Sequence, residues 1–435
     1  MKKFLVILAM TMLVIGLSAQ TVTLKYANWN LGTAEENNIE RQMIAAFMET
    51  HPNIVVKIDD RITGDWPAAL AAAAAAGGLP DVFMLQTIPG ALANDWVMDI
   101  SALAKADKEY STLPKVVSGA TVYNGKTFAV PFALHMMGYF VNKDVFEGAN
   151  AKAPTTAWKL ADFTKIMKDY NQPASGVLPL SEEVQIVDWY ASAANPKMGY
   201  FTWDGSKFNL NSKEFLEGIA LAKSLWTAPA VWEAQPKDIK DKFPGGWHGE
   251  AWNNGNIALR WDGTWAVPDI TKLAKFNWDF IGVPGGRTII VNDYVGIANG
   301  TKRPAEAYEF AKWMSWGKEG FLKRLQLAAK ANTLPSTLPM VTDKTVLDAY
   351  FKVQTVPGVK ALYATLDKGV VEAFKWLPGY IPARWDGQVK AGQKIGDLLW
   401  NSVRGDVKVA DVIDELNTLS NTKYKEAARK LGFIK

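Results

Sequence analysis

The stretch TVTLKYANWNLGTAEENNIERQMIAAFMETHPNIVVKI, residues 21–58, decides the fold. Residues 21–27 alternate in polarity as a half-buried strand does, and the apolar residues within 39–47 recur at helical spacing. Pro52 predicts the end of that helix, because proline resists helix continuation. Residues 54–58 predict a second strand, so the chain opens as strand, helix and strand.

The same alternation continues over the next segment. Residues 68–76 are almost pure alanine, which has the best helix propensity, and the glycines at 77 and 78 predict the helix end. A further strand is predicted at 82–85. Strands that alternate with helices predict an α/β fold built on a parallel sheet.

The rest of the chain continues in this style. Strands are predicted at 128–132, 138–141, 278–283 and 295–298, and helices at 156–170, with Thr155 or Thr156 as its cap, and within 304–329. Gly317 and Gly320 divide the last of these into two helices. Neither an internal repeat nor a long linker is present, so we expect lobes that are interleaved or tightly connected.

The N-terminus has the pattern of a secretory signal peptide. Two lysines precede the uncharged run Phe4–Leu17, and Ser18 and Ala19 are small residues suited to cleavage. A membrane anchor is the alternative, but a spanning helix needs roughly 20 apolar residues. We therefore expect residues 1–19 to be removed, which lowers the formal charge from +4 to +2.

The composition excludes several classes of protein. At roughly 150 residues per domain, 435 residues predict two or three domains. The chain has no cysteine, which excludes disulfides, thiolate metal sites and an acylated-cysteine anchor, and its three histidines are far apart. A net charge of +2 after cleavage gives no basis for binding nucleic acid or an anionic membrane. We expect no metal and no cofactor.

Tryptophan is the most informative residue type. Eighteen are present, and nine of them fall between Trp226 and Trp316. Aromatic rings on loops suit the flat apolar faces of pyranose sugars, and burying about 100 Å² of such a face would contribute roughly 2.5 kcal/mol. Tryptophan is also a core residue, and Trp313 and Trp400, in helical runs, are the clearest candidates for packing alone.

Several stretches together resemble one known family. They are His51–Val56, Ala76–Phe83, Tyr123–Pro131 with Phe140–Asp144, Ala153–Trp158, Ala251–Trp265, Val295–Asn299 and Pro304–Ala307. Their order and spacing resemble the extracellular solute-binding proteins of ABC sugar importers, the maltose-binding-protein-like class called family 1. Gly263-Thr264-Trp265 resembles the Gly-x-Trp of that family.

The resemblance implies two doubly wound α/β lobes of the periplasmic-binding-protein type with a ligand cleft between them. The expected N-terminal lobe is 20–137 plus 297–334, and the expected C-terminal lobe is 138–296 plus 335–435. The chain is expected to cross between them near Met137-Gly138, near Val295-Gly296 and near Leu334–Ser336.

The resemblance also implies a set of ligand-binding residues. They are Asn28, Trp29, Asn30, Gln86, His135, Asp188, Trp189, Trp247, Asp262, Trp265, Asn292, Tyr294, Arg384 and Trp385. Trp265 is the principal candidate for stacking on a sugar. His135 could instead be a satisfied buried histidine, and Asp262 could cap a turn. Gln86 departs from maltose binders, which look more acidic and aromatic at this point.

The implied function is capture of a sugar, and in particular an oligosaccharide, for the membrane permease of an ABC importer. We expect a periplasmic monomer that performs no catalysis and contacts no nucleic acid. The sequence does not fix the sugar, and Arg384 and Arg287 leave an acidic sugar open.

Three alternatives remain open at this point. A secreted glycosidase needs two carboxylates about 5–10 Å apart, and the available ones are Glu182, Glu183, Asp188, Glu250 and Asp262. Gly285-Gly286-Arg287 could hold the phosphate of a phosphorylated polyol. An interaction protein without a small ligand is the third class.

Overall fold

The computed structural model describes residues 21–243 and 245–434, so the predicted signal peptide lies outside the described residues. The strands are β1 Val22–Ala27, β2 Ile54–Ile58, β3 Val82–Leu85, β4 Val122–Tyr123, β5 Lys126–Thr127, β6 Val130–Asn142, β7 Leu178–Leu180, β8 Ile257–Gly263, β9 Trp278–Gly282, β10 Ile289–Ile297 and β11 Val370–Val371.

The helices are α1 Ile39–Thr50, α2 Trp66–Ala75, α3 Ile88–Ala93, α4 Ser101–Ala106, α5 Lys115–Ser118, α6 Lys143–Gly148, α7 Leu160–Asp169, α8 Ile186–Ala194, α9 Lys213–Thr227, α10 Lys237–Lys240, α11 His248–Asn253, α12 Val267–Leu273, α13 Pro304–Met314, α14 Lys318–Lys330, α15 Lys344–Val353, α16 Pro357–Tyr363, α17 Ile395–Arg404 and α18 Val409–Lys430. No helix among the described residues is both long and apolar enough to cross a membrane.

One sheet connects the whole molecule. Its strand order is β2-β1-β3-β10-β6-β8-β7, with β11 beside β10 and β9 beside β6. The predicted α/β class is confirmed, but the sheet is mixed. β1 runs parallel to β2 and β3, whereas β10 is antiparallel to both β3 and β6. The change of direction arises because β6 and β10 carry the chain between the two lobes in opposite senses.

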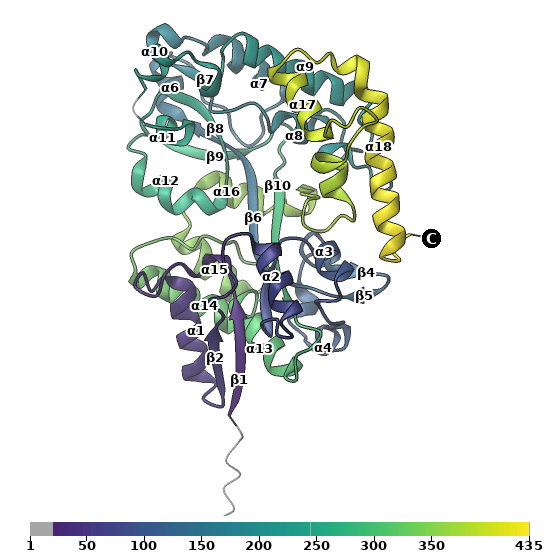
Figure 1. Cartoon of the computed structure of the whole chain (residues 1–435). Helices are drawn as coiled ribbons and strands as arrows, with labels where there is room; N and C mark the ends of the chain where they lie inside the picture. The colour runs from purple at the N-terminus through teal and green to yellow at the C-terminus, as the bar shows by residue number, and fades with distance from the viewer. Residues whose placement is uncertain (1–20, 244, 435) are drawn as a thin grey trace, which may run out of the picture.

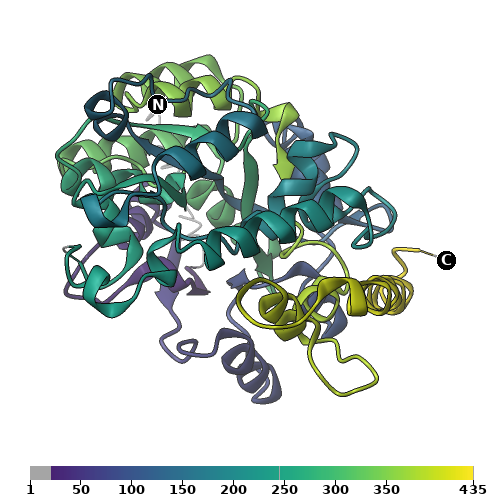
Figure 2. The same cartoon turned by 90° about the horizontal axis from the view of Figure 1, so that it is seen from above.

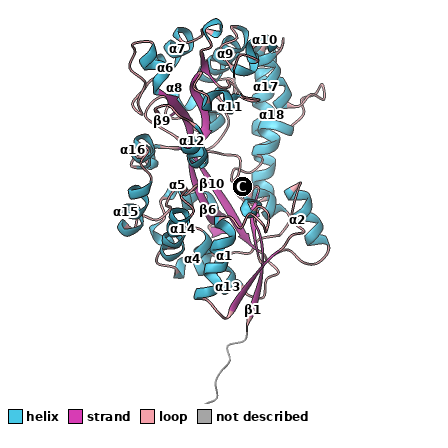
Figure 3. Cartoon of the chain, turned by 90° about the vertical axis from the view of Figure 1, so that its left-hand side faces the viewer, coloured by secondary structure: helices cyan, strands magenta, loops and turns pink. Residues whose placement is uncertain are grey.

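The two lobes are defined by their packing. In the first lobe α1, α13 and α14 pack on one another beside β1–β3, and in the second lobe α9 packs against α8 and α17 beside β7–β9. Figure 1 shows these two groups with β6 and β10 between them. Figure 3 shows the strands as a band that runs from one lobe to the other. Figure 2 shows the last helices, in yellow, together at one side of the molecule.

The strand β6 corrects a prediction. Residues 128–132 and 138–141 are predicted as two separate strands, but residues 130–142 form one strand of 13 residues, and residues 128–129 lie outside it. Pro131 lies opposite Tyr294, where the register with β10 shifts, and a bulge accommodates a residue without an N–H. A Cβ at Gly138 would lie 2.5 Å from the Cα of Gly282, so only glycine fits there.

The third crossing also differs from its expected place at Leu334–Ser336. Leu338 forms a bridge with β6, and Tyr350 of α15 packs against α14, so this segment stays with the first lobe. The chain joins the second lobe at α16, where the N–H of Gly358 donates to Asp279 of β9 at 2.8 Å. Pro335 therefore lies in an irregular segment that stays with the first lobe, and the crossing comes after it.

The predicted helix starting at residue 156 begins four residues later. The side chain of Asp162 accepts from the N–H of Lys159 at 2.8 Å, and this bond starts α7 at Leu160. The expected caps Thr155 and Thr156 lie before the helix, because the carboxylate of Asp162 at the third helical position caps its N-terminus.

Candidate functional site

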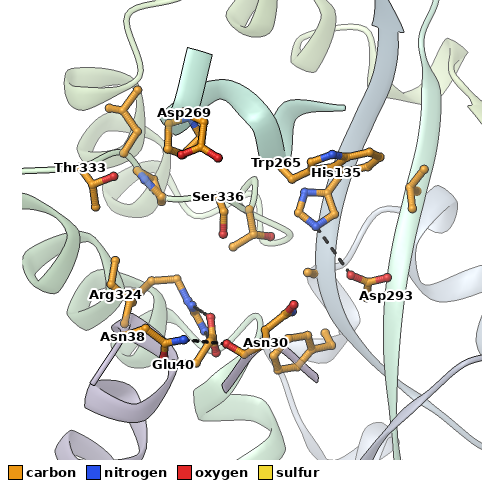
Figure 4. A pocket seen from close by; sticks show the side chains of 18 of the residues that line it. Asn30, Asn38, Glu40, His135, Trp265, Asp269, Asp293, Arg324, Thr333 and Ser336 are labelled. Atoms are coloured by element: carbon orange, nitrogen blue, oxygen red, sulfur yellow. Dashed lines mark hydrogen bonds and ion pairs between the residues drawn. The ribbon is translucent and has the colours of Figure 1, made fainter. Parts of the chain in front are cut away.

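A cavity of about 720 Å³ lies between the lobes, where β6 and β10 pass from one to the other. Figure 4 shows Asp269 and Trp265 on one side of it and Asn38, Glu40 and Arg324 on the other. Both lobes and both crossing strands therefore contribute to one space. Its size is within the range of small-molecule sites.

The floor of the cavity is a cluster of charged groups on and beside the crossing strands. His135 of β6 lies with its Nε2 3.7 Å from Oδ2 of Asp293 on β10, and the ammonium group of Lys375 contacts Oδ1 of the same carboxylate. Burial acts to raise the pKa of Asp293, but His135 and Lys375 outweigh it and hold that pKa well below its usual range. Asp293 is therefore an anion fixed at the centre of the site.

Trp265 forms part of the second-lobe wall. This residue is 39% exposed, and its ring meets the ring of His135 edge-to-face at 5.3 Å between centroids. A Cβ at Gly263 would lie 2.3 Å from this indole, so glycine is what allows the ring to fold back over the end of β8. The expected sugar-stacking ring is thus in the cavity with one face partly free.

The first-lobe wall is built at the start of α1. The side chain of Asn38 accepts from the N–H of Arg41 at 3.2 Å as the N-cap and donates to the carbonyl of Asn30 at 2.9 Å. Two residues further along, the carboxylate of Glu40 accepts two bonds from the buried guanidinium of Arg324 on α14. The ion pair is fixed further because Arg324 also donates to a backbone carbonyl of α13 at 2.8 Å.

Two carboxylates of the lining have no ion pair or side-chain hydrogen bond among the described residues. Asp269 is exposed on α12, and Glu372 lies next to β11, where its N–H donates to the carbonyl of Ile290 at 2.8 Å. Burial raises the pKa of Glu372 to about 7; Lys375 acts against this shift, while the negative charge of Asp293 adds to it. Glu372 is thus a carboxyl group that lacks a cationic partner.

Two expected residues of β10 face away from the cavity. Val291 and Asp293 line it, so Asn292 and Tyr294 point to the opposite side by the alternation of a strand. Asn292 donates to the carbonyl of Val116 at 2.9 Å, and Tyr294 is buried in the core beneath α2 and α3. The expectation failed because both faces of β10 are buried, and composition alone does not tell them apart.

Three more expected residues are engaged inside the second lobe. Asp188 of α8 accepts from Nε of Arg384 at 2.9 Å, and both side chains are buried. Trp189 is fully buried and donates to the hydroxyl of Tyr139 at 3.1 Å. The Asp188–Arg384 ion pair and the ring of Trp189 therefore stabilise the interior of the second lobe and offer no free group to a ligand.

The loop after β1 is divided between two cavities. Asn30 lines the 720 Å³ cavity, whereas Asn28 and Trp29 line a neighbouring one of about 260 Å³. Asn28 is buried and caps the following turn by accepting from the N–H of Asn30 at 2.7 Å, and Trp29 meets Trp66 edge-to-face at 5.3 Å. Gln86 is exposed after β3 and lines neither cavity.

The remaining expected residues lie on the second lobe outside the cavity. Arg260 binds Asp262 at 3.1 Å and lies 5.4 Å from the ring of Trp247, and Arg384 stacks on Trp385 at 3.8 Å. Trp400, expected to pack in the core, is instead 44% exposed. It is a surface ring supported by the guanidinium of Arg404 at 4.1 Å.

The candidate catalytic carboxylates are engaged in structural contacts. Glu183 is bound by Arg404 at 2.6 Å, Asp188 by Arg384, Asp262 by Arg260, and Glu250 accepts from the N–H of Gly246 at 2.6 Å. Glu182 lies 3.8 Å from Nε2 of His248; burial raises the pKa of this glutamate and lowers that of the histidine. The candidate phosphate ligand Arg287 donates to the backbone carbonyls of Ser192 and Lys368 at 2.8 and 2.9 Å.

Sequence reasoning identified Asn30, His135 and Trp265 in the cavity and missed most of its charged residues. The missed residues are Glu40, Asp269, Asp293, Arg324, Glu372 and Lys375. Asp293 had a signal, because a charge within the apolar run 289–297 needs a buried partner. Glu40 and Arg324 are 284 positions apart, and no local pattern joins them.

Comparison with known proteins gives a family and a fold. The family model described as bacterial extracellular solute-binding protein matches residues 33–315. An ABC substrate-binding protein from Listeria monocytogenes in complex with cycloalternan has a TM-score of 0.69 and 18% identity, and the match covers 95% of this chain and 100% of that one. The GacH receptor of Streptomyces glaucescens, solved unliganded and with acarbose, has a TM-score of 0.66 and 16% identity over 94% and 99% of the two chains.

A cyclo/maltodextrin-binding protein complexed with maltotetraose is similar at a TM-score of 0.65 and 16% identity, over 94% of this chain and 98% of that one. A search of curated proteins gave no match. At these identities the solved structures establish the fold, while the family model covers well over half of the chain.

Proposed function

The chain belongs to the family of bacterial extracellular solute-binding proteins, and on that premise we propose that it captures an oligosaccharide between its lobes and delivers it to an ABC importer. The observation that carries the proposal is the 720 Å³ cavity with walls from both lobes and an exposed tryptophan in one wall. The solved structures that share the fold include complexes with cycloalternan, acarbose and maltotetraose.

Binding in such a cavity is coupled to closure of the lobes. A ligand that touches Trp265 on one side and Asn30 on the other makes both sets of contacts only when the walls are close together. Since only differential affinity shifts a conformational population, these two-sided contacts favour a closed form. Rotation about β6 and β10 changes the separation of the walls, and the closed lobes form the surface offered to the permease.

We further propose that the mature protein is a periplasmic monomer released by cleavage after Ser18 or Ala19. The signal pattern supports export, and the absence of cysteine argues against a lipid anchor. The protein acts without catalysis, since four of the five candidate carboxylates of a glycosidase are held by arginines or a backbone N–H and the fifth lies beside His248.

The experiment is a thermal-shift screen of the mature chain against mono- and oligosaccharides, with tryptophan fluorescence recorded in parallel. A ligand at 100 times its dissociation constant should add about 2.7 kcal/mol to the free energy of unfolding. One class of sugar should raise the melting temperature and remain unconsumed over hours. Consumption would indicate a glycosidase, and no response to any sugar would reject the proposal.

The variant Trp265→Ala should weaken the binding of that sugar by about 2 kcal/mol, roughly thirtyfold, because the ring contributes apolar area to the contact. Trp400→Ala is the matched control, since Trp400 is exposed to a similar extent but lies outside the cavity. Isothermal titration calorimetry measures both. Equal losses in the two variants would place the sugar elsewhere.

A further inference from the structure

The inference rests on the proposed function and concerns the class of sugar. We propose that the ligand carries a protonated amine in place of a hydroxyl, and that Glu372 and Asp269 bind this cation. The cavity is then a site for an amino sugar, with one carboxylate beside the crossing strands and the other on the second lobe.

The pairing of charges in the lining carries the argument. Its cations Arg324 and Lys375 are both bound to carboxylates of the same lining, namely Glu40 and Asp293. The imidazole of His135 lies beside Asp293 as well, at 3.7 Å. Within the described part of the chain, the cavity therefore offers an incoming ligand no arginine or lysine that is free of a partner.

The carboxylates are in excess. Besides Glu40 and Asp293, the lining contains Asp269 and Glu372, which have no ion pair among the described residues. The charged groups that act on Glu372 are Lys375, which is already bound to Asp293, and the carboxylates of Asp293 and Asp188. The raised pKa of Glu372 supports this reading, since burial and the nearby carboxylates outweigh the attraction of Lys375.

This pattern discriminates among sugars by charge. A uronate would bring a further anion into a site whose cations are occupied, so it would lose hydration without gaining a partner. A neutral sugar would leave the half-buried carboxyl of Glu372 without a cation. An ammonium group gains an unpaired carboxylate as its partner and makes charge-assisted hydrogen bonds, which are stronger than neutral ones. The other arginines considered for an acidic sugar, Arg384 and Arg287, are engaged with Asp188 and with backbone carbonyls.

The test compares matched ligands by calorimetry at neutral pH and low ionic strength. The probes are glucose, galactose and mannose and their dimers, each in the neutral, 2-amino and 2-acetamido form, with galacturonate as the anion. The amino form should bind about tenfold more tightly than its neutral counterpart. That advantage should decrease in about 0.5 M salt, where exposed charges are screened.

A neutral or acetylated sugar that binds as tightly as its amino form would overturn this inference and leave the proposed function intact. Absence of binding by every sugar would reject both. Preference for galacturonate would contradict the charge argument directly.

Variants test which residues provide the selectivity. Glu372→Gln and Asp269→Asn should each reduce the preference for the amino sugar by about threefold and change binding of the neutral form much less. Asp411→Asn is the control, because Asp411 is exposed at the start of α18 and lies outside the cavity. Asp269 is also exposed, so its variant tests the inference even if Glu372→Gln disturbs folding. An unchanged preference in Asp269→Asn and in any folded Glu372→Gln would overturn the assignment.

Discussion

Lys375 lies beside two carboxylates and contacts only one of them. Its ammonium group binds Asp293, whose pKa is held low, while Glu372 is left with a pKa of about 7. Because Lys375 binds only one of the two carboxylates, Asp293 stays an anion while Glu372 titrates near neutrality. The asymmetry comes from position, because Asp293 has His135 as a second neighbour and Glu372 does not.

The pKa of Glu372 predicts a pH dependence of stability. Its ordinary pKa is 4.5 and its value in the folded chain is about 7, so the folded state binds more protons between these values. The free energy of unfolding should fall as pH rises from about 5 to 8, by about 3 kcal/mol at most. Glu372→Gln should remove this decline. Urea unfolding of both proteins across this range measures it, and identical pH profiles would contradict it.

For single residues, the sequence predicted which side chains could bind a ligand better than it predicted which other residues they contact in the folded chain. Trp265 could be found because Gly263 and Thr264 form a short local motif with it. Asn292 and Tyr294 were placed on the wrong face, since an apolar strand buried on both sides has no alternation to read. The pair of Asp188 and Arg384 joins residues 196 positions apart, which only the folded chain brings together.

At the scale of elements, β6 is the component on which the site depends. It positions His135 in the cavity, pairs with β10 in the first lobe and pairs with β8 and β9 in the second. The N-terminal alternation of β1, α1, β2, α2 and β3 could be predicted because each element has its own periodicity and its own stop signal. β6 could not, because neighbouring strands accommodate Pro131 and Gly138, and these partners are distant in sequence.

The close contact of Gly138 predicts the effect of a single methyl group. In Gly138→Ala the new Cβ would lie 2.5 Å from the backbone of Gly282, and the strands must separate, at a cost of about 1–3 kcal/mol. Gly300→Ala is the control, because nothing lies within 4 Å of a Cβ at that position. Thermal unfolding compares the two. A melting temperature of Gly138→Ala no lower than that of Gly300→Ala would show that β6 and β9 separate without cost.

At the scale of the whole molecule, the two lobes are not independent bodies. β6 and β10 have their ends in different lobes and are hydrogen-bonded along their length, so loss of one lobe removes strand partners from the other. The chain also crosses a third time, before α16, and α16 packs on β9. Motion between the lobes is therefore bending of shared strands, and separation of the lobes would require unfolding.

Shared strands predict a single unfolding transition. Calorimetry of the mature chain without ligand should give one peak with equal calorimetric and van't Hoff enthalpies, because neither lobe keeps its sheet alone. Tryptophan fluorescence and far-ultraviolet circular dichroism should report the same midpoint. Two resolved peaks would show that each lobe is stable without the other.

The position of β10 in the sheet has a consequence for the order in which the sheet can assemble during synthesis. This strand lies between β3 and β6, yet its residues 289–297 are made long after both of its neighbours. Until β10 has been synthesised, β3 and β6 each have one unpaired edge, because the strand that hydrogen-bonds to both of them is still missing. The sheet of the first lobe therefore cannot be completed before residue 297 has been made, so its two earlier halves join only after about two thirds of the polypeptide exists.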